Sequence, residues 1–134
     1  MIDQALEAEG YVGAPLRVLQ TGPRCFRLLG ELDLSSAEPL SRFLDSELAL
    51  PGDLTLDLRG LTFIDSAGLH LFIGAAAALG GRGGLRLLEP RRSVAKVIET
   101  TGLDRVANLE VVSSEDAQRG GTGPVVPVSP IDLS

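Results

Sequence analysis

Hydrophobic positions follow two periods between residues 15 and 112. Short aliphatic runs, partly alternating with polar residues, are typical of strands and predict five of them, at residues 16–19, 25–29, 54–58, 85–88 and 109–112. Three longer segments are predicted as helices, at residues 35–48, 67–79 and 91–101. The order ββαβαβαβ, with short loops, predicts an α/β sandwich. Its mixed, mostly parallel sheet has about five strands, with the helices packed on it.

Local signals support these boundaries. The cluster Thr21 to Arg24 predicts a turn, so the first two strands form a hairpin. Ser35 followed by Glu38 is typical of a capping box at the first helix. Gly102 stands where a helix-ending glycine belongs, and this predicts that the next residue, Leu103, packs back on the third helix.

The two ends of the chain differ from this middle part. Residues 1–14 are acidic and contain glycine, and we expect a flexible N-terminal arm. Residues 113–134 are rich in Ser, Gly, Pro and Thr without periodicity, so a disordered C-terminal tail is expected. One domain, residues 15–112, lies between them.

Composition excludes several classes of protein. The net charge of −6 argues against nucleic-acid binding, which needs a basic patch. No apolar stretch approaches the roughly 20 residues of a membrane span, and the N-terminus lacks a signal-peptide pattern. A single cysteine, Cys25, rules out an intrachain disulfide and a thiolate metal cluster. We therefore expect a cytoplasmic protein without metal or cofactor.

Ser66, between a strand and an apolar helix, is the residue most suited to chemistry. The pattern predicts that Ser66 is the N-cap of the helix with its hydroxyl at the surface, and capping alone is a sufficient reason for a serine there. A hydrolase is not supported, because Ile64 replaces the first glycine of Gly-x-Ser-x-Gly and the only histidine, His70, has no predicted carboxylate partner. An acyl carrier domain also carries an Asp-Ser pair at a helix start, but such domains are all-helical. The glycines at 80–84 lack the Lys-Ser/Thr ending of a phosphate-binding loop.

Three segments in order resemble the STAS domains of bacterial anti-sigma factor antagonists. They are Leu56 to Leu69 (LDLRGLTFIDSAGL), Gly30 to Asp33 (GELD), and Val97 to Leu103 (VIETTGL). The resemblance covers about residues 15–112. The family often has serine where this chain has Ala67, and this departure leaves Ser66 in place.

The resemblance implies a regulatory binding module rather than an enzyme. An anti-sigma factor with serine kinase activity would bind the unphosphorylated form, release its sigma factor and phosphorylate Ser66, which ends the complex. A PP2C-type phosphatase would restore the serine. The expected partner-binding residues are Asp33, Asp57, Asp65, Ser66, Ala67 and Gly68. The alternative is a STAS scaffold subunit of a lipid-transport or signalling complex in which Ser66 is never phosphorylated.

Overall fold

The longest strand, β3 (Leu54–Ile64), is the centre of the sheet in the computed structural model, which describes residues 16–113. Leu54, Leu56 and Leu58 alternate with polar residues along it and are fully buried. The strand runs six residues beyond the predicted end at Leu58. The extension forms because residues 60–64 continue the parallel pairing with the preceding strand, which also extends past its predicted end.

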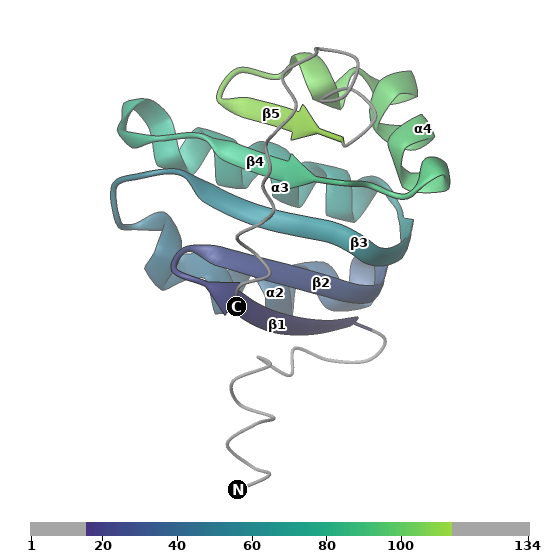
Figure 1. The fold of residues 1–134 in the computed structure, drawn as a ribbon, viewed down its shortest axis with the longest axis horizontal. Helices are drawn as coiled ribbons and strands as arrows, with labels where there is room; N and C mark the ends of the chain where they lie inside the picture. Colours follow the sequence, from purple (N-terminus) through teal and green to yellow (C-terminus); the bar gives the residue numbers. More distant parts are fainter. Residues whose placement is uncertain (1–15, 114–134) are drawn as a thin grey trace, which may run out of the picture.

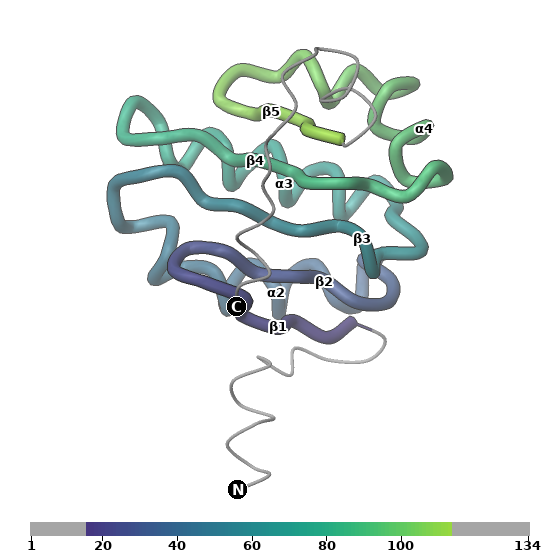
Figure 2. The backbone as a smooth tube through the Cα atoms, in the orientation of Figure 1, coloured from purple at the N-terminus to yellow at the C-terminus, as the bar shows by residue number. Residues whose placement is uncertain are grey.

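Five strands form one sheet, as predicted, and they lie in it in the order β1-β2-β3-β4-β5. Strand β1 (Leu16–Gly22) pairs antiparallel with β2 (Cys25–Leu32), so the predicted hairpin is present. Strands β2 to β5 are parallel, with β4 at Leu85–Leu88 and β5 at Leu109–Val112. The helices between them are α2 (Leu34–Leu48), α3 (Ser66–Leu79) and α4 (Arg92–Thr101), and Figures 1 and 2 trace their connections.

Helices α2 and α3 cover one face of the sheet and lie behind it in Figure 1. Each crossover steps to the adjacent strand in the same direction, and right-handed crossovers of this kind place their helices on the same face. A single aliphatic core fills the space between the layers, and Phe72 of α3 is its largest fully buried side chain. The last helix ends as predicted, because Gly102 has a left-handed backbone (φ +81°) and Leu103 is buried.

The predicted cap of the first helix is wrong. Helix α2 begins one residue earlier than the Ser35–Glu38 pattern indicated, and Asp33 is its N-cap. The Asp33 carboxylate accepts from the Ser35 backbone N–H, while the Ser36 hydroxyl accepts from the Asp33 N–H (3.0 Å) and completes the capping box. A carboxylate two residues ahead of the expected serine provides the same cap, since Asp and Ser rank almost equally there.

The predicted arm at residues 1–14 and nearly all of the predicted tail at residues 113–134 lie outside the described residues. Within residues 16–113, no helix has the length and apolar character that a membrane crossing requires.

Gly68 and Gly74 of α3 provide a matched test of the packing between helix and sheet. A Cβ at Gly68 would lie 2.8 Å from side-chain atoms of both Ile64 and Leu32, whereas nothing lies within 4 Å of one at Gly74. We expect Gly68→Ala to lower the free energy of unfolding by about 1–3 kcal/mol through overpacking. Gly74→Ala should raise it by up to about 1 kcal/mol through helix propensity. Urea denaturation of both variants measures this difference, and equal effects would contradict the tight packing.

Candidate functional site

The carboxyl ends of β2 and β3 meet at one edge of the sheet and place two aspartates side by side. Leu32 pairs with Ile64 in the parallel register, so the residues that follow, Asp33 and Asp65, both leave the sheet at this edge. Each is the N-cap of the next helix, Asp33 of α2 and Asp65 of α3. The site is therefore built from two equivalent strand–aspartate–helix units.

Asp65 joins the two units. Its Oδ1 accepts from the backbone N–H groups of Ala67 (2.9 Å) and Gly68 (3.2 Å) in the first turn of α3. Its Oδ2 accepts from the Leu34 N–H (3.2 Å), the first residue of α2. One half-buried carboxylate thus satisfies helix-terminal donors of both helices, which have no partner within their own helix.

Ser66 is the first residue of α3 rather than its N-cap, so this prediction is corrected. The cap position belongs to Asp65 because a carboxylate accepts two N–H groups at once, as its Oδ1 does here. Ser66 is exposed, as the sequence predicted for its hydroxyl. Because it has no capping role, its hydroxyl is available at the surface of the helix terminus.

The other predicted site residues divide into two groups. Ala67 is half-buried next to Ser66, and Gly68 is buried against Leu32 and Ile64, so Gly68 shapes the first turn without forming part of the surface. Asp57 lies on β3, seven residues before the last residue of the strand, Ile64, and is therefore not part of the edge with Ser66. Its contacts are with Arg27 and Arg59 instead.

Hydrogen bonds determine the charge state at Asp33 and Asp57. The hydroxyl of Ser35 donates to Asp33 (2.7 Å) and lowers the pKa of that carboxyl. Burial alone would raise the pKa of Asp57, which is 3% exposed, but hydrogen bonds from Arg59 and Arg27 outweigh it and the pKa lies below its usual value. Both carboxylates are ionised at neutral pH. Only Asp33 lies at the edge with Ser66, so that surface is anionic before any modification, whereas Asp57 faces Arg27 and Arg59.

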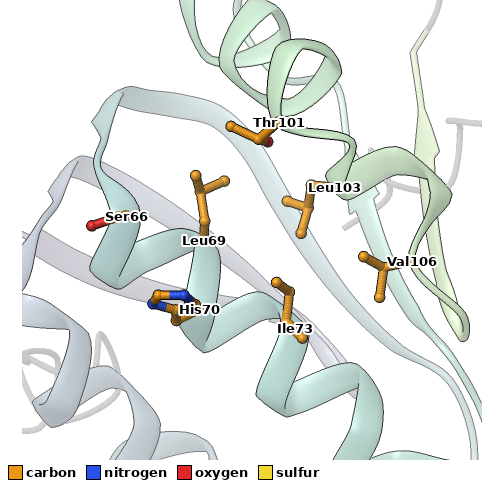
Figure 3. A pocket seen from close by; sticks show the side chains of 7 residues that line it. All are labelled: Ser66, Leu69, His70, Ile73, Thr101, Leu103 and Val106. Atoms are coloured by element: carbon orange, nitrogen blue, oxygen red, sulfur yellow. The ribbon is translucent and has the colours of Figure 1, made fainter.

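Apolar surface accompanies these charges. Leu34 is 78% and Phe63 47% exposed, so two large apolar side chains reach the surface close in sequence to Asp33 and Asp65. A groove of about 270 Å³ runs from Ser66 between α3 and the end of α4. In Figure 3 the Ser66 hydroxyl points away from the apolar side chains of this groove. The groove is lined by Ser66, Leu69, His70, Ile73, Thr101, Leu103 and Val106.

Sequence reasoning missed the exposed apolar residues and the groove. Leu34 directly follows Asp33, and its exposure follows from its place as the first residue of α2, before the buried stripe of that helix begins. His70 is exposed and lines the groove, and among the described residues no hydrogen bond joins it to Ser66. The groove itself depends on how α4 lies against α3, which no local pattern specifies.

Comparisons with known proteins agree with this geometry. A family model described as "Mlab, STAS domain" matches residues 20–112. The structure of an anti-sigma factor antagonist from Mycobacterium paratuberculosis is similar, with TM-score 0.65 and 24% identity over 81% of this chain and 97% of that one. The unphosphorylated form of the anti-sigma factor antagonist SpoIIAA gives TM-score 0.58 and 23% identity over 83% and 99%. The phosphorylated form of the Bacillus cell fate determinant SpoIIAA gives 0.53 and 21% over 79% and 98%. No curated protein matches the chain.

Asp65 provides a test of the cap. We expect Asp65→Ala to lower the free energy of unfolding by about 1–2 kcal/mol, because α3 loses its cap and Leu34 loses an acceptor. Asp65→Asn should retain most of the stability, since asparagine caps almost as well. Thermal and urea unfolding measure both variants. An Asn variant as unstable as the Ala variant would assign the effect to charge rather than to capping.

Asp57 predicts a pH dependence. Its pKa is depressed in the folded state, so its stabilisation is present above the unfolded value of about 4 and is lost as the pH falls further toward the folded value. At pH 7, Asp57→Asn should cost roughly 1–3 kcal/mol through lost charged hydrogen bonds. The difference in the free energy of unfolding between Asp57→Asn and wild type should decrease below about pH 4.

The control for this experiment is the exposed pair of Glu110 and Arg86, 3.4 Å apart. Glu110→Gln should change stability by less than about 1 kcal/mol. Urea unfolding at pH 7, 5, 4 and 3 tests the set. If the difference in the free energy of unfolding between Asp57→Asn and wild type stays constant over this range, the depressed pKa of Asp57 is contradicted.

Proposed function

The chain belongs to the STAS domain family, and on that premise we propose that it is an anti-sigma factor antagonist switched by phosphorylation of Ser66. The observation that carries the proposal is the exposed Ser66 hydroxyl at the first position of α3, beside two carboxylates and released from capping by Asp65. The similar structures include SpoIIAA in unphosphorylated and phosphorylated forms, which supports the same chemistry here.

In the proposed cycle the unphosphorylated chain binds an anti-sigma factor with serine kinase activity, and the sigma factor is released in the cytoplasm. The kinase, which holds ATP and magnesium, then phosphorylates Ser66 and the complex dissociates. A PP2C-type phosphatase restores the hydroxyl. The chain itself is a binding module and a substrate rather than an enzyme.

The geometry explains how the fold accepts a phosphate. Phosphorylation adds about −1.5 to −2 charges at pH 7. The added group extends into solvent from the first turn of α3, where the positive end of the helix dipole favours negative charge. The N–H groups of Ala67 and Gly68 stay with Asp65, so the fold keeps its cap whether or not Ser66 is modified.

The same charge weakens binding. A bound kinase surface covers Ser66 and removes water, and each acidic group about 4 Å away then costs on the order of 4 kcal/mol at an effective dielectric constant of 20. A cost of that size lowers affinity roughly 1,000-fold. Asp33 and Asp65 already make this surface anionic, so the phosphate concentrates charge where the partner must approach.

The partner contacts of this proposal combine charge with apolar surface. Asp33, Asp65 and Ser66 supply the polar part, and Ala67 lies next to them. The exposed Leu34 and Phe63 and the groove beside Ser66 supply apolar area of the kind found in the centre of interfaces. Gly68 contributes by allowing α3 to approach the sheet.

The alternative is a STAS scaffold subunit of a lipid-transport or signalling complex. The matching family model carries the description of a Mlab STAS domain, which favours keeping this second candidate. Such a scaffold uses the same surface without a phosphate cycle. The two candidates therefore differ in whether Ser66 is modified and in whether a negative charge there changes binding.

Phosphorylation of the full chain tests the proposal. Candidate anti-sigma factor kinases are incubated with ATP and with wild type, Ser66→Ala or Ser35→Ala, and mass spectrometry locates the phosphate. We expect one phosphate in wild type and in Ser35→Ala and none in Ser66→Ala. Ser35 is the matched control, because it is an exposed serine in the first turn of α2 beside the same site.

Binding completes the test. Calorimetry should give a Kd for Ser66→Asp at least tenfold weaker than for wild type, because the variant carries part of the phosphate charge. Ser66→Ala should bind like wild type. If no kinase modifies Ser66 and Ser66→Asp binds every partner like wild type, the switch is wrong and the scaffold is favoured.

A further inference from the structure

The sheet face opposite α2 and α3 carries more arginine than the rest of this acidic protein would suggest. Strand register places one set of side chains on this open face, since paired residues of neighbouring strands point to the same side. The open face consists of Arg17, Leu19, Cys25, Arg27, Leu29, Thr55, Asp57, Arg59, Arg86, Leu88, Glu110 and Val112.

Within these strands four arginines face two carboxylates, and Glu89, directly after β4, adds a third that interacts electrostatically with Arg59. Asp57 is almost fully buried between Arg27 (3.0 Å) and Arg59 (2.8 Å), so one carboxylate serves two guanidinium groups. The side chains of Arg59 and Arg86 remain 54% and 41% exposed. The half-buried Leu29 and Leu88 lie among these charges, so the open face is basic and aliphatic at once.

The negative charge of the chain is concentrated at its two ends, outside the sheet and its helices. Residues 16–113 hold eleven Lys or Arg and twelve Asp or Glu, and are close to neutral. The net charge of −6 therefore comes almost entirely from the two ends. Asp3, Glu7 and Glu9 lie within seven residues, DQALEAE, that contain no basic side chain and include aliphatic ones. This acidic segment, residues 3–9, lies outside the family match, which begins at residue 20.

We propose that the open face binds the acidic segment of the same chain. Its carboxylates pair with the exposed arginines, and its aliphatic residues contact Leu29 and Leu88. This inference concerns a surface distinct from the Ser66 site and does not depend on phosphorylation.

Chain length permits this contact. Glu9 lies seven residues before Leu16, the start of β1, and extended chain spans about 3.3 Å per residue, or roughly 23 Å. Three strand spacings of about 4.8 Å separate β1 from β4. Along the strands, Leu16 is level with Gly30 of β2, whereas Arg86 is level with Cys25, five residues or roughly 17 Å away. Glu9 can therefore reach Arg27 and Arg59, and Glu7 and Asp3, which lie farther from Leu16 along the chain, can reach Arg86. A short tether also gives an effective concentration in the millimolar range, which favours this segment over the same segment of a second copy.

Paramagnetic broadening of amide signals tests the proposal in the full chain. A nitroxide is attached at Ala5→Cys in a Cys25→Ser background, and a matched sample carries it at Ser129→Cys. With the label at position 5, we expect selective loss of intensity at the amides of Arg27, Asp57 and Arg86, and little at Arg42 and Ala77 on the outer surfaces of α2 and α3. The Ser129→Cys label should broaden the open-face amides less.

Two controls identify the cause. The triple variant Asp3→Asn, Glu7→Gln, Glu9→Gln should lose the selective broadening. The labelled chain with its native carboxylates should also lose it at about 1 M salt, where the Debye length is about 3 Å. Equal broadening on both faces, or selective broadening that survives in the triple variant, would overturn the proposal. Stronger open-face broadening from position 129 would assign the C-terminal segment instead, and broadening of an unlabelled ¹⁵N chain by added spin-labelled chain would assign a second copy.

Discussion

The direction of the crossovers is the constraint on which the rest of this structure depends. From β2 to β5 each connection leads to the adjacent strand, always in the same direction along the sheet. Because such crossovers are right-handed, α2 and α3 collect on one face (Figure 1). Two consequences follow together: the carboxyl ends of β2 and β3 deliver two helix N-termini to one edge, and the opposite face of the sheet is left to polar and half-buried residues.

Electrostatics then follows the helix axes. Asp33 and Asp65 bind the N-terminal ends of α2 and α3, while guanidinium groups of Arg24 and Arg82 donate to carbonyl oxygens at the C-terminal ends, including those of Leu50 and Ala49. Charges of each sign thus lie where the helix dipoles favour them. The edge with Ser66 is the anionic end of this arrangement. The fold therefore tolerates a further negative charge there, and that charge changes the affinity for a partner that binds this edge.

Local sequence patterns predict much of the fold, and there are physical reasons why they do not predict the rest. Strand and helix periods predicted the five described strands and the three described α-helices, and Gly102 predicted the end of α4. The short 3-10 helices at Gly80–Arg82 and Leu103–Arg105 were not predicted. The extension of β3 to Ile64 was missed, because residues 59–64 do not alternate and become strand only by pairing with β2. Both cap positions were displaced by one or two residues toward an aspartate, since Asp and Ser are nearly equal as caps and sequence alone does not rank them. The ion pairs of Asp57 and the groove beside Ser66 required the register and the placement of α4.

The displaced cap changes how a switch at this site works. A serine that capped α3 would use its oxygen to hold the helix terminus, so phosphorylation would alter stability and binding together. Here Asp65 holds Ala67, Gly68 and, across the site, Leu34. Ser66 is the next residue and carries none of those bonds. Stability and signalling are therefore assigned to neighbouring side chains, and a charge placed on Ser66 acts on whatever binds the surface rather than on the helix that presents it.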